Sequence, residues 1–100
     1  MPAVKERDIR KALKERVESY GGQIRAVSWL NRKSAPDVLV LLPGEHLFVE
    51  TKAPGGKPTD IQQTEHKRMR DAGCEVLVIS TLAQLDGWLP RKGERENRLR

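Results

Sequence analysis

The stretch PDVLVLLPGEHLFVETK, residues 36–52, decides the fold of this 100-residue chain. Its two apolar runs, 38–42 and 46–49, are separated by the sequence Pro-Gly-Glu, which is typical of a turn. Apolar runs of this length on either side of a turn predict a β-hairpin with buried strands. Charged residues lie at both ends of the hairpin, and charges beside buried strands need a specific reason.

The side chains at the ends of this hairpin are candidates for a functional site. Because side chains alternate along a strand, Glu50 and Lys52 share one face with Phe48, and Thr51 points to the other face. We expect Asp37, just before the first strand, to lie across from the end of the second. Two carboxylates and an ammonium group would then converge, and carboxylates suit Mg²⁺ or Mn²⁺, which activate water and neutralise phosphate charge. Taken singly, each signal is more often a turn residue or a solvated strand pair.

Length and charge limit the class of protein. One hundred residues allow one domain, which we place at 1–90, and a core this small would gain from pairing with a second copy. The net charge of +5 suits an anionic partner such as nucleic acid, although solubility alone also explains it. Cys74 is the single cysteine, which excludes an intrachain disulfide. No apolar run has the length of a membrane span or signal core, so we expect a cytoplasmic protein.

A first helix is predicted over residues 4–20, because Ile9, Leu13 and Val17 recur at helical spacing. One further step back along this stripe is Glu6, which therefore faces inward. Glu6 is a candidate third acidic ligand, or an orienter of one. The alternative is that it only complements the helix dipole.

The remaining elements are predicted as strands over 23–30 and 75–79 and helices over 59–72 and 81–89. This order predicts an α/β fold in which a mixed β-sheet is flanked by helices in two or three layers, with a parallel connection between the last two strands. Residues 91–100 carry five basic and two acidic residues and no apolar periodicity, so we expect a basic, disordered tail.

The second helix offers one more site candidate. Thr59 and Gln62 have the spacing of a capping box, which explains Gln62 without any function. If a glutamine reaches the site, it is Gln62. His66 lies one turn further on, where we expect it near the rim and without a catalytic role.

Loops next to the hairpin carry basic residues that are candidates for phosphate contacts. Arg32 and Lys33 precede the first strand, and Lys57 follows Lys52 in a loop rich in Gly and Pro. The alternative for all three is an ordinary solvated side chain. The spacing after Lys57 excludes a Walker-type phosphate loop.

These residues, in this order, resemble the VRR-NUC family of the PD-(D/E)xK nuclease superfamily, which has a restriction-endonuclease-like core. The resemblance is carried by Glu6, Pro36-Asp37, Glu50-Thr51-Lys52 and Gln62. It extends to the flanking sequences Gly21-Gly22, Leu41-Leu42-Pro43-Gly44, the segment 52–58 and Gly73. It covers the chain from about residue 6 to residue 89.

The resemblance implies a role for each of these positions. Asp37 and Glu50 would hold Mg²⁺ or Mn²⁺ together with the main-chain carbonyl of Thr51. Glu6 would join them directly or through water. Lys52 would orient the attacking water or stabilise the charge at phosphorus, and Gln62 would help to position Lys52 and the phosphate. The chain departs from the family at Ala35, where a glycine is frequent, and this affects the conformation expected for the loop.

Stand-alone members of the family resemble phage-type dimeric nucleases that cut four-way (Holliday) DNA junctions. The resemblance therefore implies a structure-selective endonuclease that acts as a homodimer in bacterial or phage-infected cytoplasm and leaves 5′-phosphate and 3′-hydroxyl ends. A two-fold dimer presents the two sites that paired cuts need. Two alternatives stay open: the same chemistry on flaps, nicks or plain duplex, and a basic module that binds nucleic acid without cutting it. Two carboxylates facing a phosphate disfavour the second alternative.

Overall fold

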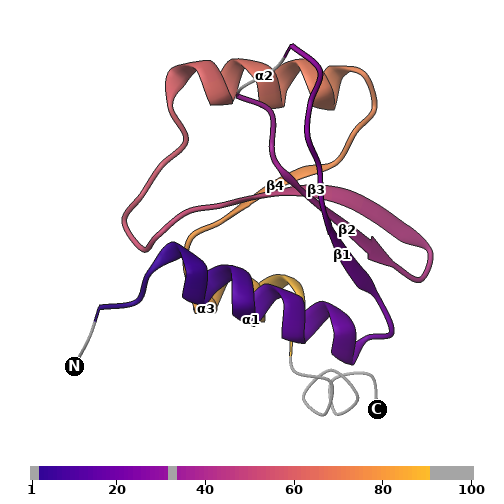
Figure 1. Cartoon of the computed structure of the whole chain (residues 1–100), viewed down its shortest axis with the longest axis vertical. Helices are drawn as coiled ribbons and strands as arrows, with labels where there is room; N and C mark the ends of the chain where they lie inside the picture. Colours follow the sequence, from indigo (N-terminus) through magenta and orange to yellow (C-terminus); the bar gives the residue numbers. More distant parts are fainter. Residues whose placement is uncertain (1–2, 32–33, 91–100) are drawn as a thin grey trace.

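The order of elements along the chain is the predicted one, in a computed structural model that describes residues 3–31 and 34–90 (Figure 1). These residues form α1 (Glu6–Ser19), β1 (Gln23–Ala26), β2 (Val38–Leu42), β3 (Glu45–Thr51), α2 (Asp60–Asp71), β4 (Val76–Ile79) and α3 (Leu82–Trp88). No helix in this part of the chain is long and apolar enough to cross a membrane. The tail predicted over residues 91–100 lies outside the described residues, so the proposed domain boundary stays a prediction.

The four strands form one mixed sheet in the order β1-β2-β3-β4. β1 pairs with β2, and β2 with β3, in antiparallel fashion, whereas β3 and β4 are parallel. The hairpin predicted from residues 36–52 is therefore the centre of the sheet. Its register places Val38 opposite Val49, which brings the segment before β2 beside the end of β3.

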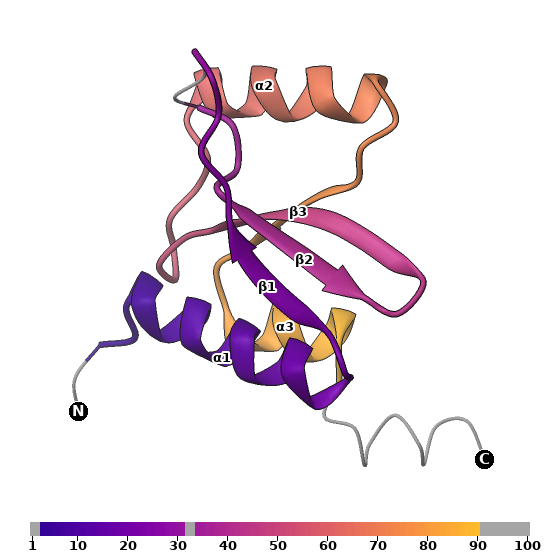
Figure 2. The ribbon, with the colours of Figure 1, turned by 45° about the vertical axis from the view of Figure 1, so that its right-hand side comes forward.

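Helices cover both faces of the sheet, which makes the fold three-layered. α1 and α3 lie against one face and α2 lies against the other (Figures 1 and 2). The main core lies on the α1 side, where Ile9, Leu13 and Val17 are fully buried against alternate residues of β2 and β3. A smaller apolar cluster lies on the α2 side and contains Ala35, Met69 and Val76, with Trp29 and Phe48 packed against it.

The strand predicted over residues 23–30 is wrong in length, because β1 ends at Ala26. Its partner β2 begins only after Pro36, which has no N–H to extend the ladder. One further bond, from the Val27 N–H to the Asp37 carbonyl at 2.8 Å, ends the pairing. Beyond it Asn31 adopts a left-handed backbone with φ of 56°, which Asn tolerates better than most residues.

The turn between α1 and β1 depends on a close approach of its backbone to the sheet. Gly22 donates its N–H to the Val17 carbonyl at 3.0 Å and so ends α1. A Cβ atom at this position would lie 2.6 Å from the Leu41 carbonyl oxygen and 2.8 Å from a methyl group of Val17. Only glycine fits here without a shift of the β2 backbone.

We therefore expect Gly22→Ala to lower the free energy of unfolding by about 1–3 kcal/mol, since the nearest atom is a main-chain oxygen that cannot rotate away. Gly87→Ala in α3 is the matched control, because a Cβ atom there would meet no heavy atom of the described residues within 4 Å beyond its own chain neighbours and helix backbone. The control should gain about 0.5–1 kcal/mol from helix propensity. Urea denaturation measures both values. A Gly22→Ala protein as stable as the wild type would contradict the tight packing of this turn.

Candidate active site

The end of β3 places polar side chains on both faces of the sheet. Glu50 follows Phe48 on the α2 face and is only 7% exposed. Thr51 points to the α1 face and is fully buried. Because β3 is paired along both edges, to β2 and to β4, neither side chain can change face without breaking the sheet.

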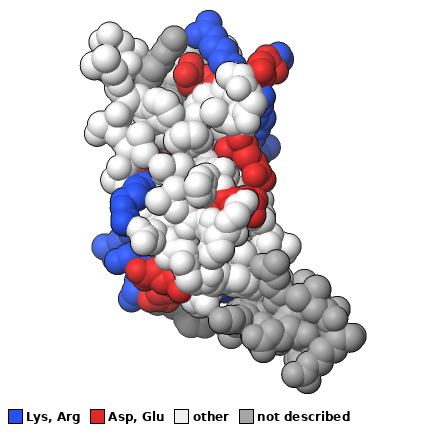
Figure 3. All heavy atoms as spheres, turned by 90° about the vertical axis from the view of Figure 1, so that its right-hand side faces the viewer, with Lys and Arg blue, Asp and Glu red and all other residues white. Residues whose placement is uncertain are grey.

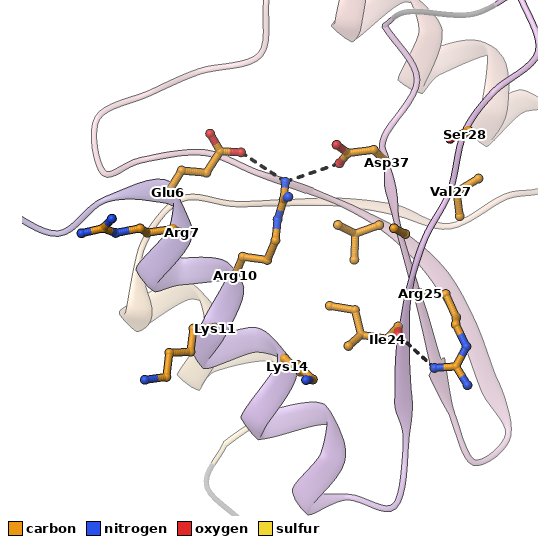
Figure 4. Close-up of a pocket in the computed structure, with 12 residues that line it drawn as sticks. Glu6, Arg7, Arg10, Lys11, Lys14, Ile24, Arg25, Val27, Ser28 and Asp37 are labelled. Atoms are coloured by element: carbon orange, nitrogen blue, oxygen red, sulfur yellow. Dashed lines mark hydrogen bonds and ion pairs between the residues drawn. The ribbon is translucent and has the colours of Figure 1, made fainter.

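On the α1 face, two acidic side chains from distant parts of the chain come together around one arginine. The Arg10 Nη2 atom lies 3.5 Å from Glu6 Oε1 and 3.5 Å from Asp37 Oδ1 (Figure 4). Thr51 completes the group, since its hydroxyl accepts from Arg10 Nε and Nη2 at 3.3 and 3.1 Å. The same hydroxyl donates to Glu6 Oε1 at 3.2 Å. The structure thus brings the side chains of Glu6, Asp37 and Thr51 together around Arg10, whereas the resemblance implies only the main-chain carbonyl of Thr51 as a ligand.

Glu50 is electrostatically part of the same group. Burial raises the pKa of its carboxyl above the ordinary value of 4.5, and the nearby Lys52 ammonium opposes this rise. The negative charges of Asp37 and Glu6 raise the pKa of Glu50 further, while Arg10 lowers it. All four charged groups therefore act on one carboxylate at the end of β3.

His66 contacts Glu50 from α2, and its predicted position at the rim is wrong. The side chain is almost fully buried, at 1% exposed, because α2 packs on the sheet through His66 and Met69. Its Nε2 atom lies 3.5 Å from Glu50 Oε1, and neither atom has a hydrogen-bond partner within the described residues. Burial lowers the pKa of His66, and the positive charges of Arg70 and Lys52 lower it further. The imidazole is thus disposed to be neutral at pH 7.

The loop that carries Asp37 is fixed by contacts on both sides. Trp29 donates its indole N–H to the Pro36 carbonyl at 2.6 Å, and its ring packs on Phe48 with centroids 5.2 Å apart. Ala35 is buried and has an ordinary negative φ, so this loop does not require the glycine that the resemblance implies at this position. The position of Asp37 therefore follows from packing and not from a special backbone conformation.

Other predicted site residues lie further from the acidic group. Gln62 Oε1 accepts from the Thr59 N–H at 2.9 Å, which confirms the predicted capping box. Its role beside Lys52 stays a prediction, because the hydrogen bonds of the Gln62 side chain in the described structure go to Thr59. Lys57 is exposed in the loop after β3.

The nucleic-acid contacts predicted before β2 cannot be placed, since Arg32 and Lys33 lie outside the described residues. Lys52 is half-buried, and its N–H donates to the Ile79 carbonyl at 3.0 Å. This bond anchors the backbone of Lys52 to the end of β4.

Two residues of the site were missed by sequence reasoning. Arg10 lies four residues after Glu6 in α1, and this spacing could have predicted an ion pair between the two side chains. The position of His66 was predicted from helical periodicity alone. Periodicity does not show how closely α2 packs on the sheet, and this packing buries His66.

A groove leads away from the acidic group between α1 and β1. It has a volume of about 840 Å³, and Glu6, Arg10 and Asp37 line it (Figure 4). Four further basic residues line the same groove: Arg7, Lys11, Lys14 and Arg25. By contrast, the face seen in Figure 3 carries small groups of both signs around uncharged surface. The groove is thus the better candidate for an anionic ligand.

The acidic group has the ligand chemistry of a Mg²⁺ or Mn²⁺ site. Carboxylate oxygens suit these hard cations, and Glu50 offers a buried oxygen without a hydrogen bond. As the side chains stand, no three His, Cys, Asp or Glu groups within residues 3–31 and 34–90 are arranged around a common point for an ion. Arg10 instead supplies the positive charge between Glu6 and Asp37.

The chain is similar to a phage protein and to a solved domain structure. No family model matches the chain. A protein of Acyrthosiphon pisum secondary endosymbiont phage 1, described as "Putative nuclease p44", is 40% identical over 82 residues, which are 81% of this chain and 88% of the phage protein. A solved structure described as "VRR_NUC domain" superposes with a TM-score of 0.79 at 40% identity, over 90% of this chain and 99% of that one.

We expect Glu50→Gln to raise the free energy of unfolding at pH 7 by about 0.5–2 kcal/mol, because it removes a charge whose burial the fold opposes. A carboxyl with a raised pKa binds its proton more tightly in the folded state. The wild type therefore loses stability as the pH rises from 4.5 through the raised pKa, and the variant does not.

Urea denaturation of both proteins from about pH 4 to about pH 8 tests this, and the difference between them should shrink toward the acidic end. Glu15→Gln, on the exposed side of α1, is the control and should change little. If Glu50→Gln were instead the less stable protein at pH 7, the carboxylate would be anchoring the fold.

Proposed function

This chain belongs to the VRR-NUC family, and on that basis we propose that it is an endonuclease that hydrolyses phosphodiester bonds in DNA with Mg²⁺ or Mn²⁺. The observation that carries the proposal is the buried carboxylate of Glu50 at the end of β3, whose pKa is raised by burial and further by the charges of Asp37 and Glu6. A buried carboxylate with a raised pKa and a free oxygen is costly to the fold. Such a group is expected where function and not stability selects it.

The residues that would hold the metal ion are Asp37, Glu50 and the main-chain carbonyl of Thr51, with Glu6 bound directly or through water. A divalent ion at this place would neutralise phosphate charge and lower the pKa of a water molecule. The raised pKa of Glu50 supports this assignment, because burial and the charges of Asp37 and Glu6 all disfavour its ionised form, and a bound cation would oppose them.

Besides the metal ion, the Lys52 side chain would supply a positive charge at the site. Its ammonium group is close enough to the Glu50 carboxyl to lower the pKa of that group. From there it would orient the attacking water or stabilise the charge that develops on the phosphate oxygens. Gln62, on α2, would help to hold Lys52 and the phosphate in place.

We further propose that the preferred substrate is branched DNA, most simply a four-way junction, cut by a homodimer. The similarity to a phage protein described as "Putative nuclease p44" supports the nuclease activity in this proposal. Leu30 and Ile61 are 89% and 71% exposed, and covering them in a second copy would bury apolar surface that the small core leaves outside. Flaps, nicks or plain duplex are the alternative substrates for the same chemistry.

Asp37→Asn is expected to lower the cleavage rate about 100-fold or more, because an amide cannot replace the charge of a metal ligand. Lys52→Ala should lower the rate more than the affinity for DNA. Lys67→Ala is the matched control for the loss of one lysine, since Lys67 is exposed on α2 and pairs with Asp71. Single-turnover cleavage with Mg²⁺ and DNA binding with Ca²⁺ give the two readouts.

Equal losses of rate and affinity in Lys52→Ala would indicate that Lys52 is a simple phosphate contact. Loss of helical circular dichroism in Asp37→Asn would indicate that Asp37 supports the fold.

The substrate is tested with matched junction, flap, nicked and linear DNA of one sequence, each with Mg²⁺, with Mn²⁺ and with EDTA. The mass of the protein in solution is measured on the same preparation. We expect metal-dependent cleavage, fastest on the junction, by a particle of twice the chain mass. Tight DNA binding without cleavage in any metal would favour a non-catalytic binding module. Cleavage of linear duplex at the same rate would remove the junction preference only.

A further inference from the structure

Arg10 occupies the space between two of the carboxylates expected to bind the metal ion. Its guanidinium group is directed from α1 into the gap between Glu6 and Asp37 (Figure 4), and one nitrogen lies 3.5 Å from both. It also donates two hydrogen bonds to the Thr51 hydroxyl. The guanidinium group and a metal cation would therefore compete for the same carboxylate oxygens.

These contacts are suited to exchange. The Arg10 side chain is 44% exposed, and both of its carboxylate contacts are longer than the distance of a strong charged hydrogen bond. Arg10 lines the groove of about 840 Å³, so the side chain has room to turn away. A divalent cation carries twice the charge of the guanidinium and would compete well for Glu6 and Asp37.

We propose that Arg10 is an internal counter-ion, which neutralises the acidic group before metal binds and which a divalent cation displaces from Glu6 and Asp37. The proposal rests on the metal site of the proposed function, but it concerns the affinity of that site and not the reaction. Its consequence has a definite sign. Removal of the Arg10 charge should make metal binding tighter, whereas loss of an ordinary supporting residue would make it weaker.

The first test is calorimetric titration of the DNA-free protein with Mn²⁺, for the wild type, Arg10→Met and Arg7→Met. Arg7 is the matched control, because it lines the same groove from the same helix and forms no ion pair with Glu6 or Asp37 in the described structure. We expect the dissociation constant to fall about fivefold or more in Arg10→Met. In Arg7→Met, general electrostatics should change it by less than about twofold.

An unchanged or larger dissociation constant in Arg10→Met would overturn the proposal, and so would an equal fall in both variants. Binding to Arg10→Met but not to the wild type would support it in its strongest form. If neither protein binds Mn²⁺, the metal site of the proposed function fails, and the proposal fails with it. If both bind equally, the metal site stands and only the role of Arg10 is lost.

A second test titrates the wild-type protein and uses a variant only to assign one signal. The ¹⁵N-labelled Arg10 Nε–H group, assigned by comparison with Arg10→Lys, is followed by NMR during titration with Mg²⁺. Its signal should move as the bond to the Thr51 hydroxyl is lost, while that of Arg7 stays in place. A stationary Arg10 signal, at Mg²⁺ concentrations that shift the amides of Asp37 and Glu50, would overturn the proposal.

Discussion

The burial of one carboxylate at the end of a central strand is the constraint on which the rest of this structure depends. Glu50 is held in place because β3 pairs along both edges, so that a slip of one residue would turn its charge into the core under α1. An ionised group in this position costs free energy, and none of the described residues gives Oε1 a hydrogen bond in return. The apolar layers on both sides of the sheet offset that cost.

The alternation of side chains along β3 divides the site between the two faces of the sheet. The odd-numbered position, Thr51, joins the group around Arg10 on the α1 side. The even-numbered position, Glu50, faces His66 on the α2 side. Groups on the two faces of the sheet lie near one another only because β3 ends here. Asp37, in the segment before the neighbouring strand β2, lies beside this end. A site of this kind therefore needs the whole three-layer fold and cannot be reduced to one loop.

The sequence was sufficient to predict the hairpin, the order of elements and the mixed sheet, because these follow from apolar periodicity and turn residues that act locally. It also predicted that Glu6, Asp37 and the end of β3 would meet, since a helical stripe and a strand register define directions. The length of β1 and the burial of His66 could not be read in this way. The length of β1 depends on its pairing with β2, which begins only after Pro36, a residue without an N–H. The burial of His66 depends on how closely α2 packs on the sheet.

The carboxylates of the site differ in how firmly they are held, and this difference bears on the choice of ion. Glu50 is buried, whereas the side chains of Glu6 and Asp37 are 48% and 56% exposed. Mg²⁺ demands near-ideal octahedral geometry and keeps several of its waters, so it is usually bound by one or two carboxylates. One fixed carboxylate with two adjustable neighbours meets that demand better than three fixed ones, because the exposed side chains can bind directly or through water. In the proposed function, a rigid carboxylate built into the sheet would thus act with exposed partners that adapt to the ion and to the phosphate.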